Sequence, residues 1–101
     1  MEYFSSVTYE EIAVTAGQAV GLTAAKINKI LPKGRVRIQV ASFPIAFRTD
    51  GGTPTSATPQ QMAVGDIAYI DDITEIKNFL AIGIGGTANI GVDYAAYVGS
   101  N

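Results

Sequence analysis

The strongest constraint on this fold is a strict alternation of apolar and polar residues near the middle of the chain. In the segment RVRIQVA, residues 35–41, the side chains at positions 36, 38 and 40 are aliphatic, and those at positions 35, 37 and 39 are charged or amide. In an extended strand, alternate side chains point to opposite sides of the backbone. The segment therefore predicts a β-strand with one buried face and one face in contact with water.

Six other segments have the length and composition of strands. They are EIAVT (11–15), AVGLT (19–23), PIAFRTD (44–50), DIAYID (66–71), FLAIGIGG (79–86) and ANIGVDYAAYV (88–98). Helical spacing occurs only in ITEIKNF, residues 73–79, where Asp72 can cap the first turn and Glu75 stands at the third helical position. Short strands separated by turn residues indicate an all-β single domain over residues 1–101. The architecture expected is a β-sandwich or jelly-roll-like barrel with at most one short helical turn.

The length and apolar content of the chain are sufficient for one hydrophobic core. The sequence has 101 residues, of which 48% are hydrophobic, and a chain of this size forms a single domain. Within DIAYID, Ile67 and Tyr69 share one face and Ala68 and Ile70 the other, and we expect the face with Ile67 and Tyr69 to be buried. The predicted core residues are Val36, Ile38, Val40, Ile45, Phe47, Ile67, Tyr69, Phe79, Ile82, Ile90 and Val92.

Charge and residue usage argue against several classes of function. Lys and Arg total 7 and Asp and Glu total 9, for a formal net charge of -2, whereas binding to nucleic-acid phosphates requires a basic surface. No apolar run approaches the roughly 20 residues needed to cross a membrane. The absence of Cys rules out disulfides and thiolate metal sites, and the absence of His removes the commonest general base and metal ligand. We expect neither nucleic acid nor a membrane as partner.

The most acidic segment of the chain has a structural explanation. Asp71, Asp72 and Glu75 lie within five residues, but their spacing does not match a calcium-binding EF-hand loop. A cap for the helical turn accounts for them better. The segment GIGGTANIG, residues 83–91, lacks the Lys and the following helix of a phosphate-binding loop, and its glycines favour a tight hairpin, a bulge or close approach of strands. We therefore expect no enzymatic activity, no cofactor and no metal site.

The long loop RTDGGTPTSATPQQMAVGD, residues 48–66, is a candidate contact surface. Its DGG step is typical of a sharp turn that needs positive φ angles. Its two Pro residues stiffen the loop and lower the entropy lost on docking to a partner. The candidate contact residues are Arg48, Asp50, Gly51, Gly52, Thr53, Pro54, Thr55 and Pro59. An ordered surface loop without a partner would have a similar sequence, so both interpretations stay open.

The first eight residues, MEYFSSVT, precede the first predicted strand and carry Tyr3 and Phe4. One interpretation is a frayed terminus. The other is an extended N-terminal arm that packs these two aromatic side chains on a neighbouring subunit. Tyr3 and Phe4 therefore join the candidate contact residues.

Three segments of the chain resemble small virion proteins of tailed bacteriophages. They are PIAFRTDGGTPTSATPQQMAVGD (44–66), IKNFLAI (76–82) and ANIGVDYAAYV (88–98), and VGLTAAKI (20–27) also fits. Recurrent elements of these proteins are a strand ending in an F-R-x-D-G turn, a P-T step, a G-D or G-E hairpin, an I-K-x-F-x-A-I strand and a final A-x-I-x-V-x-Y strand. The resemblance covers most of the chain, and the sequence departs from it in a longer loop and an aromatic N-terminus.

The resemblance implies a compact β domain located in a virion, with the capsid surface favoured. The role that the resemblance favours is that of a decoration, or cement, protein, which stabilises the shell by bridging neighbouring capsid subunits. The partner would be the major capsid protein or another virion protein, and the symmetry of shells favours a homo-oligomer, with a trimer first. The alternative is a tail, fibre or connector component that binds a host-surface glycan or another virion protein. A glycan binder would cluster exposed aromatic side chains in loops, whereas here Tyr and Phe fall mostly within predicted strands, which favours the structural role.

Overall fold

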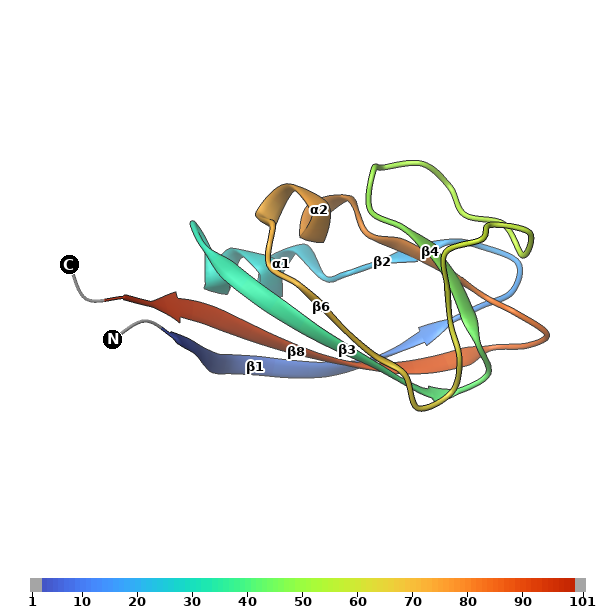
Figure 1. Cartoon of the computed structure of the whole chain (residues 1–101), viewed down its shortest axis with the longest axis horizontal. Coiled ribbons are helices and arrows are strands. Elements are labelled where there is room, and N and C mark those ends of the chain that lie inside the picture. Colours follow the sequence, from blue (N-terminus) through green and yellow to red (C-terminus); the bar gives the residue numbers. More distant parts are fainter. Residues whose placement is uncertain (1–2, 100–101) are drawn as a thin grey trace.

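The chain forms two antiparallel β-sheets of four strands each (Figure 1). In this computed structural model, which describes residues 3–99, sheet A has the strand order β1-β8-β3-β6 and sheet B the order β2-β7-β4-β5. Sheet A contains β1 (Tyr3–Val14), β8 (Ala88–Val98), β3 (Gly34–Ser42) and β6 (Ile67–Ile70), and sheet B contains β2 (Val20–Gly21), β7 (Leu80–Gly83), β4 (Ile45–Arg48) and β5 (Gln61–Met62). The predicted all-β fold is confirmed, and β8 has the bounds of the segment ANIGVDYAAYV.

Two short helical segments interrupt the strands. The predicted turn is present as α2 (Ile73–Asn78), and the Asp72 side chain caps it by accepting a hydrogen bond from the backbone N–H of Glu75. The second segment, α1 (Ala24–Ile27) followed by the 3-10 helix η1 (Asn28–Ile30), has no counterpart in the helical spacing of the sequence. It is too short to show a period, and it is held because Ile27 and Ile30 are buried in the core.

The hydrophobic core lies between sheet A and the layer formed by sheet B and the helices. Buried side chains come from all of these elements and include Val14, Ile27, Ile30, Val36, Ile38, Val40, Ile45, Phe47, Ile76, Phe79, Ile90, Val92 and Tyr94. The rings of Phe47 and Phe79 stack with centroids 5.7 Å apart. Eight of the predicted core residues are confirmed as buried, namely Val36, Ile38, Val40, Ile45, Phe47, Phe79, Ile90 and Val92. Ile82 is only partly buried.

The predicted orientation of β6 is wrong. Ile67 is 45% exposed and Tyr69 is 59% exposed, whereas Ile70 is buried. The reason is the register between β6 and β3, in which Tyr69 lies opposite Arg37 and Ala68 lies opposite Ile38. Because directly opposed residues of two strands share a face, Tyr69 lies on the solvent side with Arg37.

The N-terminal residues do not form a separate arm over the range that the structure describes. Tyr3 to Thr8 form the first half of β1 and pair with β8, beginning with Tyr3 opposite Val98. A bulge between Ser6 and Thr8 shifts the register. This segment therefore has a strand partner within its own chain. Met1 and Glu2, which also belong to the segment interpreted as either an arm or a frayed terminus, lie outside the described residues.

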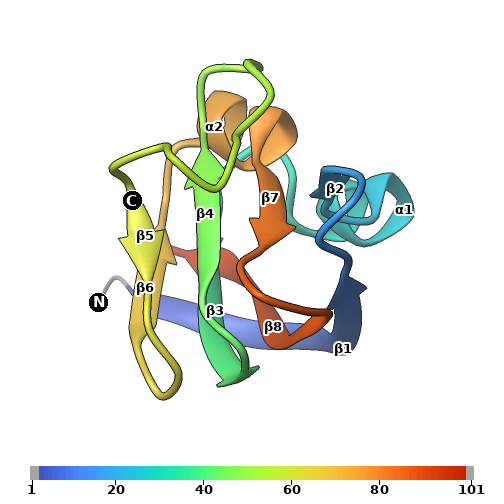
Figure 2. The same ribbon diagram turned by 90° about the vertical axis from the view of Figure 1, so that its right-hand side faces the viewer.

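Sheet A is much longer than sheet B, and this difference leaves one surface open. Its three longest strands have 9 to 12 residues, whereas the strands of sheet B have 2 to 4. The molecule is accordingly elongated, with principal extents of 46 × 24 × 22 Å. Sheet B, whose strands lie side by side in Figure 2, and the helices all lie on one side of sheet A. The other side of sheet A, here called the outer face, faces solvent.

Candidate functional site

The outer face of sheet A is built from the alternate residues of its four strands. Cross-strand register places these residues in rows that run across the sheet. One row is Glu11, Gly91, Gln39 and Ile67; the next is Tyr9, Asp93, Arg37 and Tyr69; the third is Ser6, Ala95 and Arg35; and the last begins with Phe4 and Tyr97. The face thus combines aromatic rings, cations and small residues contributed by four separate strands.

A cation–aromatic cluster occupies the end of this face near the start of β1. The guanidinium carbon of Arg35 lies 4.2 Å from the ring centroid of Phe4 and 5.4 Å from that of Tyr69. Arg35 also forms an ion pair with Asp71, with 3.2 Å between Nη2 and Oδ2. Nearby, Nζ of Lys33 lies 4.0 Å from the ring centroid of Tyr97. Each cation is therefore held over the face of a ring, where the ring quadrupole attracts it.

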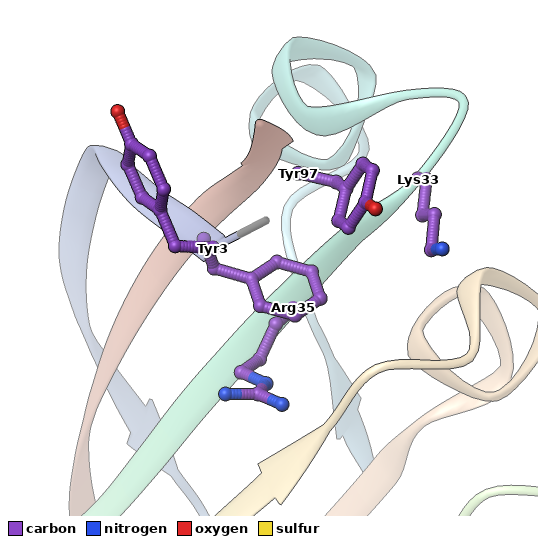
Figure 3. A pocket seen from close by; sticks show the side chains of 5 residues that line it. Tyr3, Lys33, Arg35 and Tyr97 are labelled. Carbon is purple, nitrogen blue, oxygen red and sulfur yellow. The ribbon is translucent and has the colours of Figure 1, made fainter. Parts of the chain in front are cut away.

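Two neighbouring hollows open on this cluster. The larger, of about 380 Å³, is lined by Tyr3, Phe4, Lys33, Arg35 and Tyr97. Figure 3 shows Lys33 beside the ring of Tyr97, and the side chain of Tyr3 pointing away from both. The smaller hollow, of about 200 Å³, is lined by Phe4, Ser6, Arg35, Arg37, Tyr69, Asp93 and Ala95. Its wall includes the methyl side chain of Ala95, which leaves space between the larger side chains around it.

Several polar groups of the outer face lack strong partners. The ion pairs among residues 3–99 are Arg35–Asp71 and Arg48–Asp50, so Lys33 and Arg37 have no carboxylate partner there. Arg37 Nη2 makes a long contact of 3.5 Å with Oε1 of Gln39. Nε of Arg35 is shielded from solvent and has no hydrogen-bond partner in the described part of the chain. Cations of this kind can bind anionic groups, and the rings beside them can stack on a partner.

The composition of the outer face is typical of a protein-binding surface. Tyr and Arg are enriched among the residues that contribute most to binding energy at protein interfaces. Tyr9 is 55% exposed, which is high for a large side chain within a strand. Its ring lies over Gly91, where an added Cβ would be 2.5 Å from the Tyr9 hydroxyl oxygen. This glycine therefore allows Tyr9 to lie flat on the sheet.

The turn at the start of the 48–66 loop satisfies its own charges. Arg48 donates to Asp50 through Nε at 3.0 Å and Nη2 at 2.6 Å, and the backbone N–H of Gly52 donates to Oδ1 of Asp50 at 3.0 Å. The hydrogen bonds from Arg48, followed by that from Gly52, lower the pKa of Asp50 to about 2. Gly51 has the expected positive φ, 86°. Gly52 is not in that region, and a Cβ there would lie 2.4 Å from Cζ of Arg48, so a larger residue would make the end of the Arg48 side chain move.

The rest of this loop is partly anchored in the molecule. Pro54 is fully buried, whereas Thr53, Thr55 and Pro59 are exposed. Thr55 and Thr58 close a short turn through a backbone hydrogen bond and a hydrogen bond from the Thr55 N–H to the Thr58 hydroxyl. The loop is ordered by its own contacts, and β5 lies within its span.

The structure does not bring the two expected contact regions together. Phe4 belongs to the end of sheet A where β1 begins, and the 48–66 loop lies at the other end of the molecule (Figure 1). Of the candidate contact residues, only Tyr3 and Phe4 belong to the surface formed by the cation–aromatic cluster and its two hollows. The sequence pattern did not identify five other members of this surface, namely Lys33, Arg35, Arg37, Tyr69 and Tyr97. Alternation placed Arg35 and Arg37 on an outer face, but the register that adds the rings of Tyr69 and Tyr97 is not visible in the sequence.

Two carboxylates outside this face, Asp66 and Asp72, have structural roles. Asp72 caps α2, and Asp66 accepts a hydrogen bond from the backbone N–H of Ala63 at 2.8 Å. Over residues 3–99, no group of three or more His, Cys, Asp or Glu side chains is placed to hold a metal ion. In the same range, no helix has both the length and the apolar character needed to cross a membrane.

Comparison with known proteins gives no relative: no protein-family model, no curated protein and no solved structure matches this chain.

Proposed function

We propose that this chain is a non-catalytic structural protein of a tailed-phage virion, most specifically a capsid decoration protein that acts as a homo-oligomer. It binds the major capsid protein or another virion protein through the outer face of sheet A. The observation that carries this proposal is the cation–aromatic cluster of Phe4, Lys33, Arg35, Tyr69 and Tyr97, which lies open on a sheet face. The virion context rests on the resemblance of the segments 44–66, 76–82 and 88–98.

The physical argument for a binding role is the cost of leaving such a surface in water. Exposed aromatic rings gain free energy when a partner covers them, at about 25 cal/mol for each Å² of apolar surface removed from water. The rings and Arg35 lie on four strands of one sheet, and Lys33 directly precedes β3, so these groups are positioned before the partner arrives. A rigid surface loses little conformational entropy on binding. A protein that binds only assembled subunits shifts their equilibrium toward the assembled shell.

The proposal is tested by sedimenting the full chain with assembled capsid shells of the phage that encodes it. Tyr69→Ser and Phe4→Ser should each weaken binding by at least about tenfold, which corresponds to about 1.4 kcal/mol. Phe43→Ser is a matched control, because Phe43 is also exposed but lies at the turn between β3 and β4. Equal binding by all three variants, or no binding of the wild-type chain, would contradict the proposal.

A second candidate function is glycan binding by a tail or fibre component. The observation that favours it is the smaller hollow, where the rings of Phe4 and Tyr69 lie beside the polar groups of Ser6, Arg37 and Asp93. Aromatic faces stack on sugars, and such polar groups can bind hydroxyls. The sequence favoured a structural role because Tyr and Phe fall mostly within strands. Aromatic residues within strands can still be exposed, as Tyr69 is, so this distinction between the two roles is weaker than the sequence indicated. Binding of the chain to immobilised glycans, lost in Tyr69→Ser and kept in Phe43→Ser, would select this candidate.

A further inference from the structure

We propose that the outer face of sheet A binds a second copy of this chain, about a twofold axis parallel to the strands and lying between β8 and β3. The inference rests on the proposed function: the second copy covers this surface in the free protein, and the virion partner takes its place on the shell, so the two contacts exclude each other. The available area is close to the minimum for such a contact. With strands about 4.8 Å apart and a rise of about 3.3 Å per residue, the three long strands cover about 14 by 30 Å over the length of β3, and the four residues of β6 add about 5 by 13 Å. Two such faces would bury roughly 1,000 Å², near the lower limit for a specific interface.

The central row of the face is complementary to itself. Across the sheet, from β1 to β6, it contains Tyr9, Asp93, Arg37 and Tyr69, in that order. A twofold axis parallel to the strands reverses the order of the strands in the second copy. Each aromatic residue then faces an aromatic residue, and each charge faces the opposite charge. An interface with twofold symmetry requires this kind of self-complementarity.

The two charges of this row are not paired with each other within one chain. Arg37 and Asp93 lie opposite one another on β3 and β8, yet they form none of the ion pairs among residues 3–99. Arg37 makes only its long contact with Gln39, and Asp93 accepts a hydrogen bond from the hydroxyl of Ser6 at 2.5 Å. Both groups therefore have capacity for a further charged partner, which the second copy would supply twice.

The shape of the face also favours this arrangement. The smaller hollow lies between Asp93 and Ala95 of β8 and the two arginines of β3, Arg35 and Arg37, and its volume of about 200 Å³ is enough for a guanidinium group. In the twofold arrangement, Arg37 of the second copy is directed toward Asp93 and this hollow. The short side chain of Ala95 likewise faces the long side chain of Arg35 from the other copy. Two sheets packed in this way lie about 10 Å apart, as in β-sandwiches.

The mass of the wild-type chain in solution is the first test. Sedimentation equilibrium of the full chain, from low to high micromolar concentration, should show a reversible monomer–dimer equilibrium. Arg37→Glu and Asp93→Arg should each raise the dimer dissociation constant by roughly tenfold or more, because each places two like-charged pairs across the axis. Lys29→Glu is the matched control, because Lys29 is exposed on η1 and the substitution changes the charge by the same amount. It should leave the dissociation constant unchanged.

Mixing the two reversed variants separates contact between copies from effects within one chain. In a mixed dimer of Arg37→Glu with Asp93→Arg, both pairs across the axis again carry opposite charges. Within each chain, residues 37 and 93 still carry like charges, so the mixture changes only the contact between copies. An equimolar mixture should therefore dimerise more tightly than either variant alone. If either reversal fails to fold by circular dichroism, Tyr9→Ser and Tyr69→Ser replace the pair, and each should raise the dissociation constant at least about fivefold.

A wild-type chain that stays monomeric, forms a trimer, or dimerises without any response to these substitutions would overturn the inference. So would a mixture that fails to recover association. A monomer that still sediments with capsid shells through Tyr69 would leave the proposed function intact and remove only the twofold contact. A dimer that does not bind shells would support the twofold contact and contradict the proposed function.

Discussion

At the scale of single residues, Tyr94 joins three elements of the fold. Its side chain is fully buried on β8, and its hydroxyl donates a hydrogen bond to the carboxylate of Glu10 on β1. The other oxygen of Glu10 accepts a hydrogen bond at 2.8 Å from the hydroxyl of Thr23, the residue before α1. Burial, and then the hydrogen bond to Glu10, raise the pKa of Tyr94 above its ordinary value of 10.

Removing this hydroxyl should destabilise the protein at neutral pH. Tyr94→Phe keeps the ring but takes a donor away from a carboxylate, and we expect a loss of about 2 kcal/mol in the free energy of unfolding. Urea unfolding at pH 7, followed by circular dichroism, measures this loss. An unchanged free energy of unfolding would show that water replaces the hydroxyl without cost.

The same substitution should change the response to alkaline pH. Because the folded-state pKa of Tyr94 is raised, its neutral form contributes stability that is present below pH 10 and is lost as the pH rises further. The free energy of unfolding should therefore fall less between pH 9 and pH 11 in Tyr94→Phe than in the wild-type chain, because the other tyrosines are common to both. Parallel pH dependences would contradict the assigned pKa shift.

At the scale of elements, the connection from β7 to β8 depends on a glycine. β7 belongs to sheet B and β8 to sheet A, so the glycine-rich segment carries the chain between sheets and is not a hairpin within one sheet. The expected close approach of strands is confirmed at Gly83. A Cβ there would lie 2.2 Å from the carbonyl oxygen of Gly86 and 2.7 Å from that of Val14.

Gly83→Ala should therefore cost about 3 kcal/mol in the free energy of unfolding, because the clash is with backbone atoms that cannot move independently. Gly17→Ala is the matched control. No heavy atom lies within 4 Å of a Cβ at Gly17, so that substitution should be neutral or slightly stabilising. Thermal or urea unfolding of the two variants measures this difference. Equal free energies of unfolding would mean that the backbone between β7 and β8 can move to accommodate the added Cβ without cost.

At the scale of the whole molecule, the N-terminal residues belong to the fold. Four register pairs, from Tyr3–Val98 to Ser6–Ala95, extend sheet A beyond sheet B. Phe4 packs edge-on against Tyr97, with ring centroids 5.6 Å apart, and lies under the guanidinium of Arg35. The first half of β1 thus forms one side of the proposed binding surface.

A chain that begins at Val7 should lose roughly 2 kcal/mol of stability, because each cross-strand pair contributes several tenths of a kcal/mol and the Phe4 ring adds to them. It should also lose binding to capsid shells. Phe4→Ala removes the ring but keeps the strand pairing, so it measures the contribution of the ring alone. It should lower the free energy of unfolding by about half as much as the truncation does. If the shortened chain unfolds at the same urea concentration as the full chain, residues 3–6 behave as a frayed end.

The sequence by itself determined those features that depend on neighbours along the chain. The alternation of β3, the bounds of β8, the Asp72 cap and the positive φ of Gly51 all follow from local backbone geometry. These signals establish an all-β fold because a period of two residues is compatible only with strands. They also indicate which side chains share a face within one strand.

Only the tertiary structure decided which face of each strand is buried and which strands are neighbours. DIAYID has apolar residues on both faces, so its pattern could not choose between Tyr69 and Ile70, and pairing with β3 made the choice. Pairing with β8 likewise made the first residues of the described chain a strand, whereas the sequence left both an arm and a frayed terminus open. The cation–aromatic cluster exists because register aligns side chains from four strands that are distant in sequence. Alternation is a local property, whereas register is set by the packing of the whole sheet.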